Sequence, residues 1–104
     1  MRADKNAIFH YLQELKPMFS DKNLALVGFF GSFARDEATP YSDIDIAIKK
    51  DAAYLQNRGA YDYFNDIASL KEMVMKKFHR NVDIFDIDSN SAFKEKILQE
   101  MIHV

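Results

Sequence analysis

Residues 24–48 read LALVGFFGSFARDEATPYSDIDIAI, and this stretch contains most of the information about the fold. Residues 24–30 are a short, continuously apolar run, which indicates a buried strand. Residues 42–48 alternate in polarity and predict a second strand, with isoleucines on one face and Asp43 and Asp45 on the other. Gly31 and Ser32 break the first strand, and residues 33–37 are expected to form a short helix before the second.

The flanking segments continue the alternation of helix and strand. Apolar side chains at helical spacing predict helices over residues 4–18 and 61–78. Residues 81–87 predict a third strand, and Ser89 is expected to cap a final helix that runs through Ile102. Residues 51–60 are loosely patterned and are assigned to no element. The pattern indicates an α/β (α+β) fold, a small mixed sheet of about three strands flanked by helices, in one domain over residues 1–104.

Composition narrows the classes of protein that this chain can belong to. The 104 residues are 48% hydrophobic and contain no cysteine, which excludes disulfides, cysteine-zinc sites and thiol catalysis. The formal net charge of -2 gives no sign of a strongly cationic face, so no direct nucleic-acid binding is expected. There is no apolar run of about 18 residues and no signal-peptide core, so we expect a cytoplasmic protein without membrane contact.

The residues that could take part in binding or catalysis are those of the Gly-Ser turn and the acids that follow it. Backbone N–H groups at Gly31 and the hydroxyl of Ser32 suit an anion such as a phosphate. Asp43 and Asp45 project from one face of a strand, where two carboxylates can hold hard divalent cations. A third acid is expected on the strand at 81–87. Its periodicity does not decide between Asp83 on one face and the acids at 86 and 88 on the other.

The stretch from residue 31 to residue 48 resembles the signature of the minimal nucleotidyltransferases, a family of the DNA polymerase β-like superfamily. The shared pattern is G-S, a helix that often carries A-R, then S-D-x-D and an apolar tail. The family's third acid lies in a V-D-apolar context, which Asp83 matches, so the resemblance favours this residue. One departure is visible, because the family commonly has glycine after A-R and this chain has Asp36.

The resemblance implies a Mg²⁺-dependent nucleotidyltransferase site that binds ATP and two Mg²⁺ ions. The implied catalytic acids and metal ligands are Asp43, Asp45 and Asp83. The implied nucleotide contacts are Gly31, Ser32, Arg35 and Ser42. The metal near the acceptor hydroxyl would lower the pKa of that hydroxyl for in-line attack on the α-phosphate.

The length of the chain and the resemblance together suggest a partner. A chain of 104 residues has room for the catalytic sheet and little else, so the acceptor is expected on another molecule. The resemblance implies a toxin–antitoxin pair, in which the antitoxin transfers AMP from ATP to a tyrosine of a HEPN-domain ribonuclease toxin. The alternatives are an antitoxin that acts by binding alone, or a nucleotidyltransferase with a small-molecule acceptor. A homo- or hetero-oligomer is compatible with either.

Overall fold

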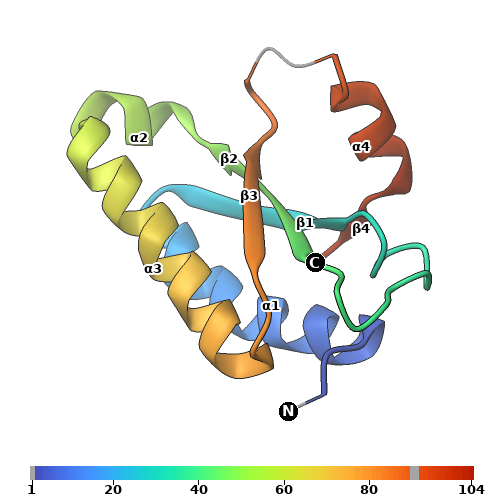
Figure 1. Cartoon of the computed structure of the whole chain (residues 1–104). Coiled ribbons are helices and arrows are strands. Elements are labelled where there is room, and N and C mark those ends of the chain that lie inside the picture. Colours follow the sequence, from blue (N-terminus) through green and yellow to red (C-terminus); the bar gives the residue numbers. More distant parts are fainter. Residues whose placement is uncertain (1, 90–91) are drawn as a thin grey trace.

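The computed structural model describes residues 2–89 and 92–104. They form a four-stranded mixed sheet with helices on both faces (Figure 1). The elements in chain order are α1 (Lys5–Ser20), β1 (Leu24–Phe30), β2 (Ile44–Lys50), α2 (Ala52–Asn57), α3 (Ala60–Phe78), β3 (Val82–Asp86), α4 (Lys94–Glu100) and β4 (Ile102–His103). The prediction of a mixed α/β fold is confirmed, with four strands in place of about three.

The strands lie in the order β3-β2-β1-β4. β1 pairs with β2 in antiparallel orientation, and the register shifts between Leu26 and Gly28, so Val27 is an extra residue in β1. β3 runs parallel to β2, which requires the long crossover through α3. β4 pairs with Gly28 and Phe29 along the other edge of β1. The sequence did not predict this fourth strand.

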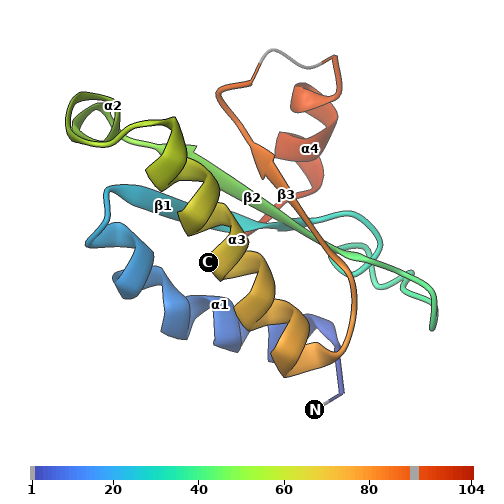
Figure 2. The same cartoon turned by 60° about the vertical axis from the view of Figure 1, so that its left-hand side comes forward.

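The two faces of the sheet are covered by different helices. α1 and α3 pack on one face, where Ile44, Ile46 and Ile48 of β2 enter the main core, and α4 lies on the other face (Figures 1 and 2). There Ala47 forms a smaller cluster with residues of α4 and β3. This division follows from the alternation in β2, because Asp45 and Ala47 point away from the isoleucines. The acids therefore lie on the face that α4 covers only in part.

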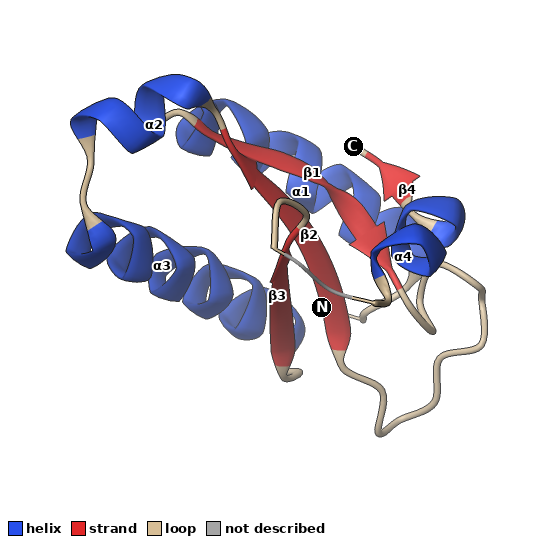
Figure 3. Ribbon diagram, turned by 90° about the horizontal axis from the view of Figure 1, so that it is seen from above, coloured by secondary structure: helices blue, strands red, loops and turns tan. Residues whose placement is uncertain are grey.

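Three expectations about elements are wrong. Residues 33–36 lie in turns and residue 37 belongs to no element, so no helix forms, and Figure 3 shows the connection between β1 and β2 as a loop. Ser89 does not cap α4; it lies in the turn after β3, where its N–H donates to the carbonyl oxygen of Asp86 (3.0 Å), and α4 begins later, at Lys94. The final helix ends at Glu100, and Ile102 belongs to β4 because its backbone pairs with β1.

The loosely patterned stretch contains α2, which Asp51 caps by accepting a hydrogen bond from the Tyr54 N–H (3.1 Å). Six residues are too few to show a helical period, so the cap is the sequence signal for this helix. Within the described part of the chain, none of the helices has both the length and the apolar character needed to cross a membrane.

Candidate active site

A pair of carboxylates from neighbouring parallel strands forms the centre of the site. Asp45 of β2 and Asp83 of β3 are direct partners in the strand register. Partners in a parallel pair project from the same face of the sheet, and the strands lie about 4.8 Å apart. The structure thus answers the question that periodicity left open, because Asp83 is the acid of β3 that lies beside Asp45.

Asp86 points to the opposite face of the sheet and is held there. Its Oδ2 accepts a hydrogen bond from the hydroxyl of Tyr63 in α3 (3.1 Å) and lies 3.3 Å from the ammonium of Lys50. Burial raises the pKa of Tyr63 to about 12, and the charge of Asp86 contributes to the same shift. Both partners belong to the α3 side of the molecule, so Asp86 supports packing there.

Asp45 is a half-buried carboxylate in an acidic environment. Its pKa is raised to about 6, first by burial and then by the negative charges of Asp83, Asp43 and Glu100. The positive charge of Arg35 acts in the opposite direction. Ionisation of Asp45 is unfavourable because the site is partly buried and holds other carboxylates. A bound cation would neutralise this negative charge, so the site favours cation binding.

The three acids do not converge as closely as the sequence predicts. Among residues 2–89 and 92–104, no group of three or more His, Asp or Glu side chains is close enough to hold a metal ion. Asp45 and Asp83 form the pair, whereas Asp43 is exposed and precedes the first residue of β2. Repulsion between like charges opposes a closer approach of three carboxylates.

Gly31 allows the turn after β1 to lie directly against Asp45. Its φ of 78° is in the left-handed region, which glycine adopts without steric cost. A Cβ at this position would collide with Oδ2 of Asp45. The left-handed backbone conformation therefore favours glycine, and a side chain at this position would in addition displace the Asp45 carboxylate.

The Ser32 segment forms a single tight turn in place of the expected helix. The N–H of Arg35 donates to the carbonyl oxygen of Gly31 (3.1 Å), and the N–H of Glu37 donates to that of Ser32 (2.8 Å). Asp36 then adopts a φ of 57°, which ends any helical continuation. This is the position at which the resembling family carries glycine, and the positive φ gives the physical reason for glycine there.

Glu100 is a site residue that the sequence did not indicate. One carboxylate oxygen accepts a hydrogen bond from the Gly31 N–H (3.2 Å), and the other accepts one from Nη1 of Arg35 (2.8 Å). Arg35 also donates from Nε to Glu37 (3.1 Å), and the bond to Glu100 is the main reason that the pKa of Arg35 is raised. The acid lies 69 positions from Gly31, so no local pattern could have linked them.

Ser42 and Arg80 fix the loop that leads into β2. The hydroxyl of Ser42 accepts a hydrogen bond from the Thr39 N–H (2.8 Å). Nη1 of Arg80 donates to the carbonyl oxygens of Thr39 and Ser42, both at 3.0 Å. Arg80 thereby holds the loop that precedes Asp43 in place. The sequence did not indicate this role, because Arg80 follows directly on the basic residues at the end of α3.

Two hollows lie beside the acids. A polar hollow of about 480 Å³ has Asp43 and Arg80 in its lining. An apolar hollow of about 430 Å³ has Gly31, Asp45 and Asp83 in its lining. Asp43 thus lines one hollow, whereas Asp45 and Asp83 line the other.

A mixed sheet that places paired carboxylates beside a Gly-Ser turn is an arrangement suited to phosphoryl-type transfer. The chain belongs to the polymerase beta nucleotidyltransferase family, whose model, described as "Polymerase beta, Nucleotidyltransferase", matches residues 13–104. It is therefore a nucleotidyltransferase.

Two relatives from Methanocaldococcus jannaschii are similar over most of their length. "Putative protein adenylyltransferase MJ1379" is 34% identical over 92 residues, which cover 86% of this chain and 83% of the relative. "Putative protein adenylyltransferase MJ0126" is 29% identical over 107 residues, which cover 96% of this chain and 93% of the relative.

A solved structure described as a "putative minimal nucleotidyltransferase" superposes with a TM-score of 0.72. The match covers 98% of this chain and 97% of the other at 23% sequence identity. At that identity the likeness concerns the fold, and it matches the four-stranded arrangement described above.

Proposed function

We propose that this protein is a Mg²⁺-dependent protein adenylyltransferase in which residues 1–104 act as one nucleotidyltransferase domain. The observation that carries the proposal is the Asp45–Asp83 carboxylate pair beside the turn at Gly31. The names of the two Methanocaldococcus jannaschii relatives support a protein as the acceptor. The nucleotidyltransferase family generally uses a nucleoside triphosphate and a divalent metal.

The carboxylates suit the metal that the family implies. Mg²⁺ prefers oxygen ligands and binds one or two protein carboxylates together with substrate phosphates. Asp45 and Asp83 would supply these ligands for two Mg²⁺ ions, and Asp43, which does not form a close group with them in this structure, would have to approach them to act as the third ligand. When bound, the metal neutralises phosphate charge and lowers the pKa of the acceptor hydroxyl.

The turn after β1 binds and orients the nucleotide in this proposal. The N–H of Gly31 and the hydroxyl of Ser32 donate to phosphate oxygens, and the guanidinium of Arg35 adds positive charge. Ser42 contacts the nucleotide at the start of β2. The acceptor oxygen then bonds to the α-phosphorus while the bond to the bridging oxygen breaks, and pyrophosphate leaves.

We further propose that the acceptor is a tyrosine of a HEPN-domain ribonuclease toxin, which AMP transfer neutralises. This partner follows from the family resemblance of the segment from residue 31 to residue 48. It makes the protein an antitoxin that acts by catalysis.

The experiment is to incubate the chain with ATP, Mg²⁺ and a candidate HEPN-domain partner, and to measure the intact mass of that partner. We expect an AMP adduct with the wild-type chain. Asp45→Asn and Asp83→Asn should each lower the rate by about a hundredfold or more, because each removes a charge from the carboxylate pair.

The control is Asp88→Asn, an exposed acid in the turn that follows β3. Its transfer rate should equal that of the wild type. An unmodified toxin under all conditions would contradict the proposal. Protection of cells by a chain that carries both Asp43→Ala and Asp45→Ala would instead favour an antitoxin that acts by binding alone.

A further inference from the structure

The side of α3 that faces away from the sheet carries exposed apolar side chains. The opposite side of the helix packs into the core through Leu70, Val74 and Phe78. The exposed apolar residues follow one another at helical spacing and are Tyr61, Phe64, Ala68 and Met75. Figure 2, in which α3 lies in front of the sheet, looks onto this outer side. An apolar stripe on the exposed side of a long helix is typical of a surface that packs against another helix.

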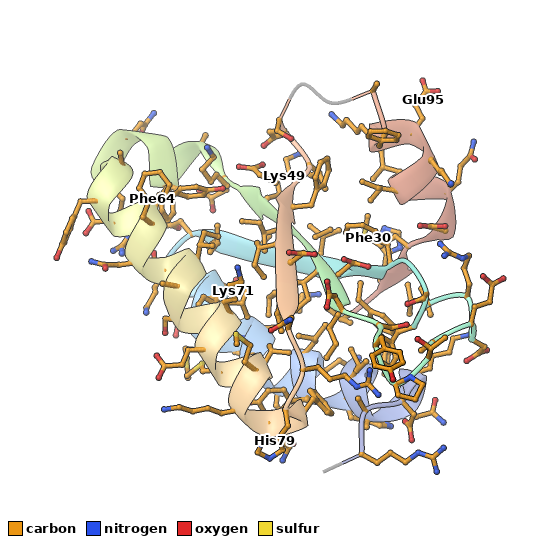
Figure 4. The ribbon with its side chains drawn as sticks, in the orientation of Figure 1. Phe30, Lys49, Phe64, Lys71, His79 and Glu95 are labelled. Atoms are coloured by element: carbon orange, nitrogen blue, oxygen red, sulfur yellow. The ribbon has the colours of Figure 1, made fainter. Side chains whose placement is uncertain are left out.

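The two halves of this stripe differ in shape. In the N-terminal half, Tyr61 and Phe64 are 79% and 68% exposed, so their rings protrude from the helix. The C-terminal half has a hollow of about 500 Å³, which is lined by Ala68, Lys71, Glu72, Met75, Lys76 and His79. Figure 4 shows Phe64 and His79 near opposite ends of α3. One side of one helix therefore carries both a protruding aromatic pair and a hollow.

The lining of the hollow suits an aromatic ring. Ala68 and Met75 are apolar, and the thioether of a methionine makes favourable contacts with rings. Lys76 and Glu72 pair with each other (2.8 Å), so their charges offset and their methylene groups remain available to a ring. Lys71 adds a positive charge, which the face of an aromatic ring attracts. The hollow thus matches a phenylalanine of the kind that protrudes from the same helix.

The spacing of the two features makes α3 complementary to a second copy of itself. The middle of the hollow lies about ten residues after Phe64, which is about 14 Å along the helix axis. A two-fold axis perpendicular to α3 beside Ala68 relates these two positions. Two antiparallel copies of α3 would therefore each insert Phe64 between Lys71 and Met75 of the other copy. Ala68 lies at the axis, where a small side chain lets the two backbones approach closely.

The charges of α3 favour the same antiparallel arrangement. The first turn of the helix contains Asp62, and the last turn contains Lys76 and Lys77. The two-fold axis places position 62 of one copy opposite position 76 of the other, so Asp62 and Lys76 meet at the rim of the contact. Antiparallel helices also bring opposite ends of their dipoles together. A parallel pair would instead place like charges side by side.

We propose that the outer side of α3 is a dimer interface through which two copies of this chain associate in antiparallel orientation. Each copy supplies both the protruding Phe64 and the hollow, so the contact closes after two copies and does not continue into a filament. A single pair of helices forms a small interface, and the dimer therefore dissociates on dilution. α3 and the Asp45–Asp83 pair lie on opposite faces of the sheet, so this inference is independent of the proposed function.

The first test is sedimentation velocity of the full chain over a concentration series of about 1–300 µM. We expect the mean mass to rise from that of a monomer toward that of a dimer. Phe64→Asp removes the inserted ring and should raise the dimer Kd about tenfold or more. The control is Phe93→Asp, since Phe93 is 69% exposed but lies just before α4, and it should leave the Kd unchanged. A wild-type chain that stays monomeric throughout, or equal weakening by the two variants, would overturn the proposal.

Disulfide cross-linking tests the position of the two-fold axis. The chain has no cysteine, so a single introduced cysteine can pair only with its counterpart in another copy. Ala68→Cys should give a disulfide-linked dimer under mild oxidation, because the two copies of position 68 meet at the axis. The matched control is Ala38→Cys, at an exposed alanine in the loop between β1 and β2, which should stay monomeric. Equal yields of linked dimer from the two variants would contradict the antiparallel pair of α3 helices.

Discussion

At the scale of single residues, Asp45 is the most constrained side chain of the site. It is half-buried, it lies beside Asp83, and the turn at Gly31 approaches it so closely that a Cβ there would displace its carboxylate. An ionised carboxylate in this position is disfavoured by burial and by neighbouring charge, which is why its pKa is raised. The residue that best suits a cation is thus also one that weakens the fold when it is ionised without a cation.

Asp45→Asn should stabilise the protein at neutral pH when divalent cations are removed by a chelator. The pKa of Asp45 is about 6 in the folded chain, against an ordinary value of 3.8, so the folded state binds this proton more tightly than the unfolded chain does. The resulting stability is complete below pH 3.8 and is lost as the pH rises through about 6. Asparagine does not ionise and avoids that loss, which is at most about 1 kcal/mol at a half-exposed site.

The measurement is thermal unfolding of both chains at about pH 4 and about pH 7.5, on either side of this titration. The variant should unfold at a higher temperature at the upper pH, with a smaller difference at the lower one. An equal difference at both values would show that the effect of the substitution is independent of this titration.

Asp36→Gly should stabilise the protein by about 0.5 kcal/mol. The φ of 57° is unfavourable for a residue with a Cβ, and glycine removes that cost at the expense of some chain entropy. The ion pair that the substitution removes, with Lys5 at 3.3 Å, is exposed and contributes little. Urea unfolding measures the change, and Asp36→Ala is the control, since alanine loses the ion pair and keeps the Cβ. If both variants lower the stability equally, the ion pair outweighs the backbone.

At the scale of elements, the C-terminal end of α4 is joined to the turn after β1. Glu100 is the last residue of α4, and its carboxylate bonds to both Gly31 and Arg35. These are two of the groups proposed to hold the triphosphate. The carboxylate therefore occupies donors that a phosphate would use, and nucleotide binding has to exchange one anion for another.

Glu100→Gln should bind ATP about fivefold more tightly, because the substitution removes a negative charge near the phosphates while an amide oxygen can still accept from the Gly31 N–H. Calorimetry or a fluorescent nucleotide gives the Kd in the presence of Mg²⁺. The matched control is Glu95→Gln, which removes the same charge at the outer end of α4 (Figure 4) and should leave the Kd unchanged. Weaker binding by Glu100→Gln would mean that this carboxylate assists the nucleotide or its metal.

At the scale of the whole molecule, the C-terminal segment closes the sheet and carries α4 into place. β4 pairs with Gly28 and Phe29, and the N–H of Val104 donates to the carbonyl oxygen of Val27 (3.0 Å). Lys16 of α1 donates to the carbonyl oxygen of Val104 (2.7 Å). The last residues are thus tied to two other parts of the fold, and these ties determine where Glu100 lies.

Gly28→Ala should destabilise the protein by about 1–3 kcal/mol, because a Cβ at this position would collide with the backbone carbonyl of Ile102 and displace β4. The same displacement should move Glu100 away from Gly31 and shift the amide resonance of Gly31. Urea unfolding and backbone NMR measure the two effects. Gly59→Ala is the control, since a Cβ there meets nothing within 4 Å, and it should cost less than about 1 kcal/mol. Equal losses in the two variants would contradict this account of β4.

Local patterns in the sequence were sufficient for the parts of the fold that have a clear period. The alternation in β2, the apolar run of β1 and the helical spacing of α1 and α3 each depend on neighbours in the chain, so their types could be predicted. The same alternation places Asp45 on the face away from the isoleucines. The resemblance of the turn and its following acids indicated the family, which the comparisons confirm.

Contacts between distant segments decided the rest. Whether Asp83 or Asp86 lies beside Asp45 depends on the register between β2 and β3. The sequence of β3 carries acids on both faces, so it does not by itself decide which one lies beside Asp45. The short strand β4, the turn in place of a helix after Gly31, and the position of Glu100 also depend on partners far along the chain. A two-residue strand has no period of its own, and a carboxylate finds its donors only when the sheet has brought them together.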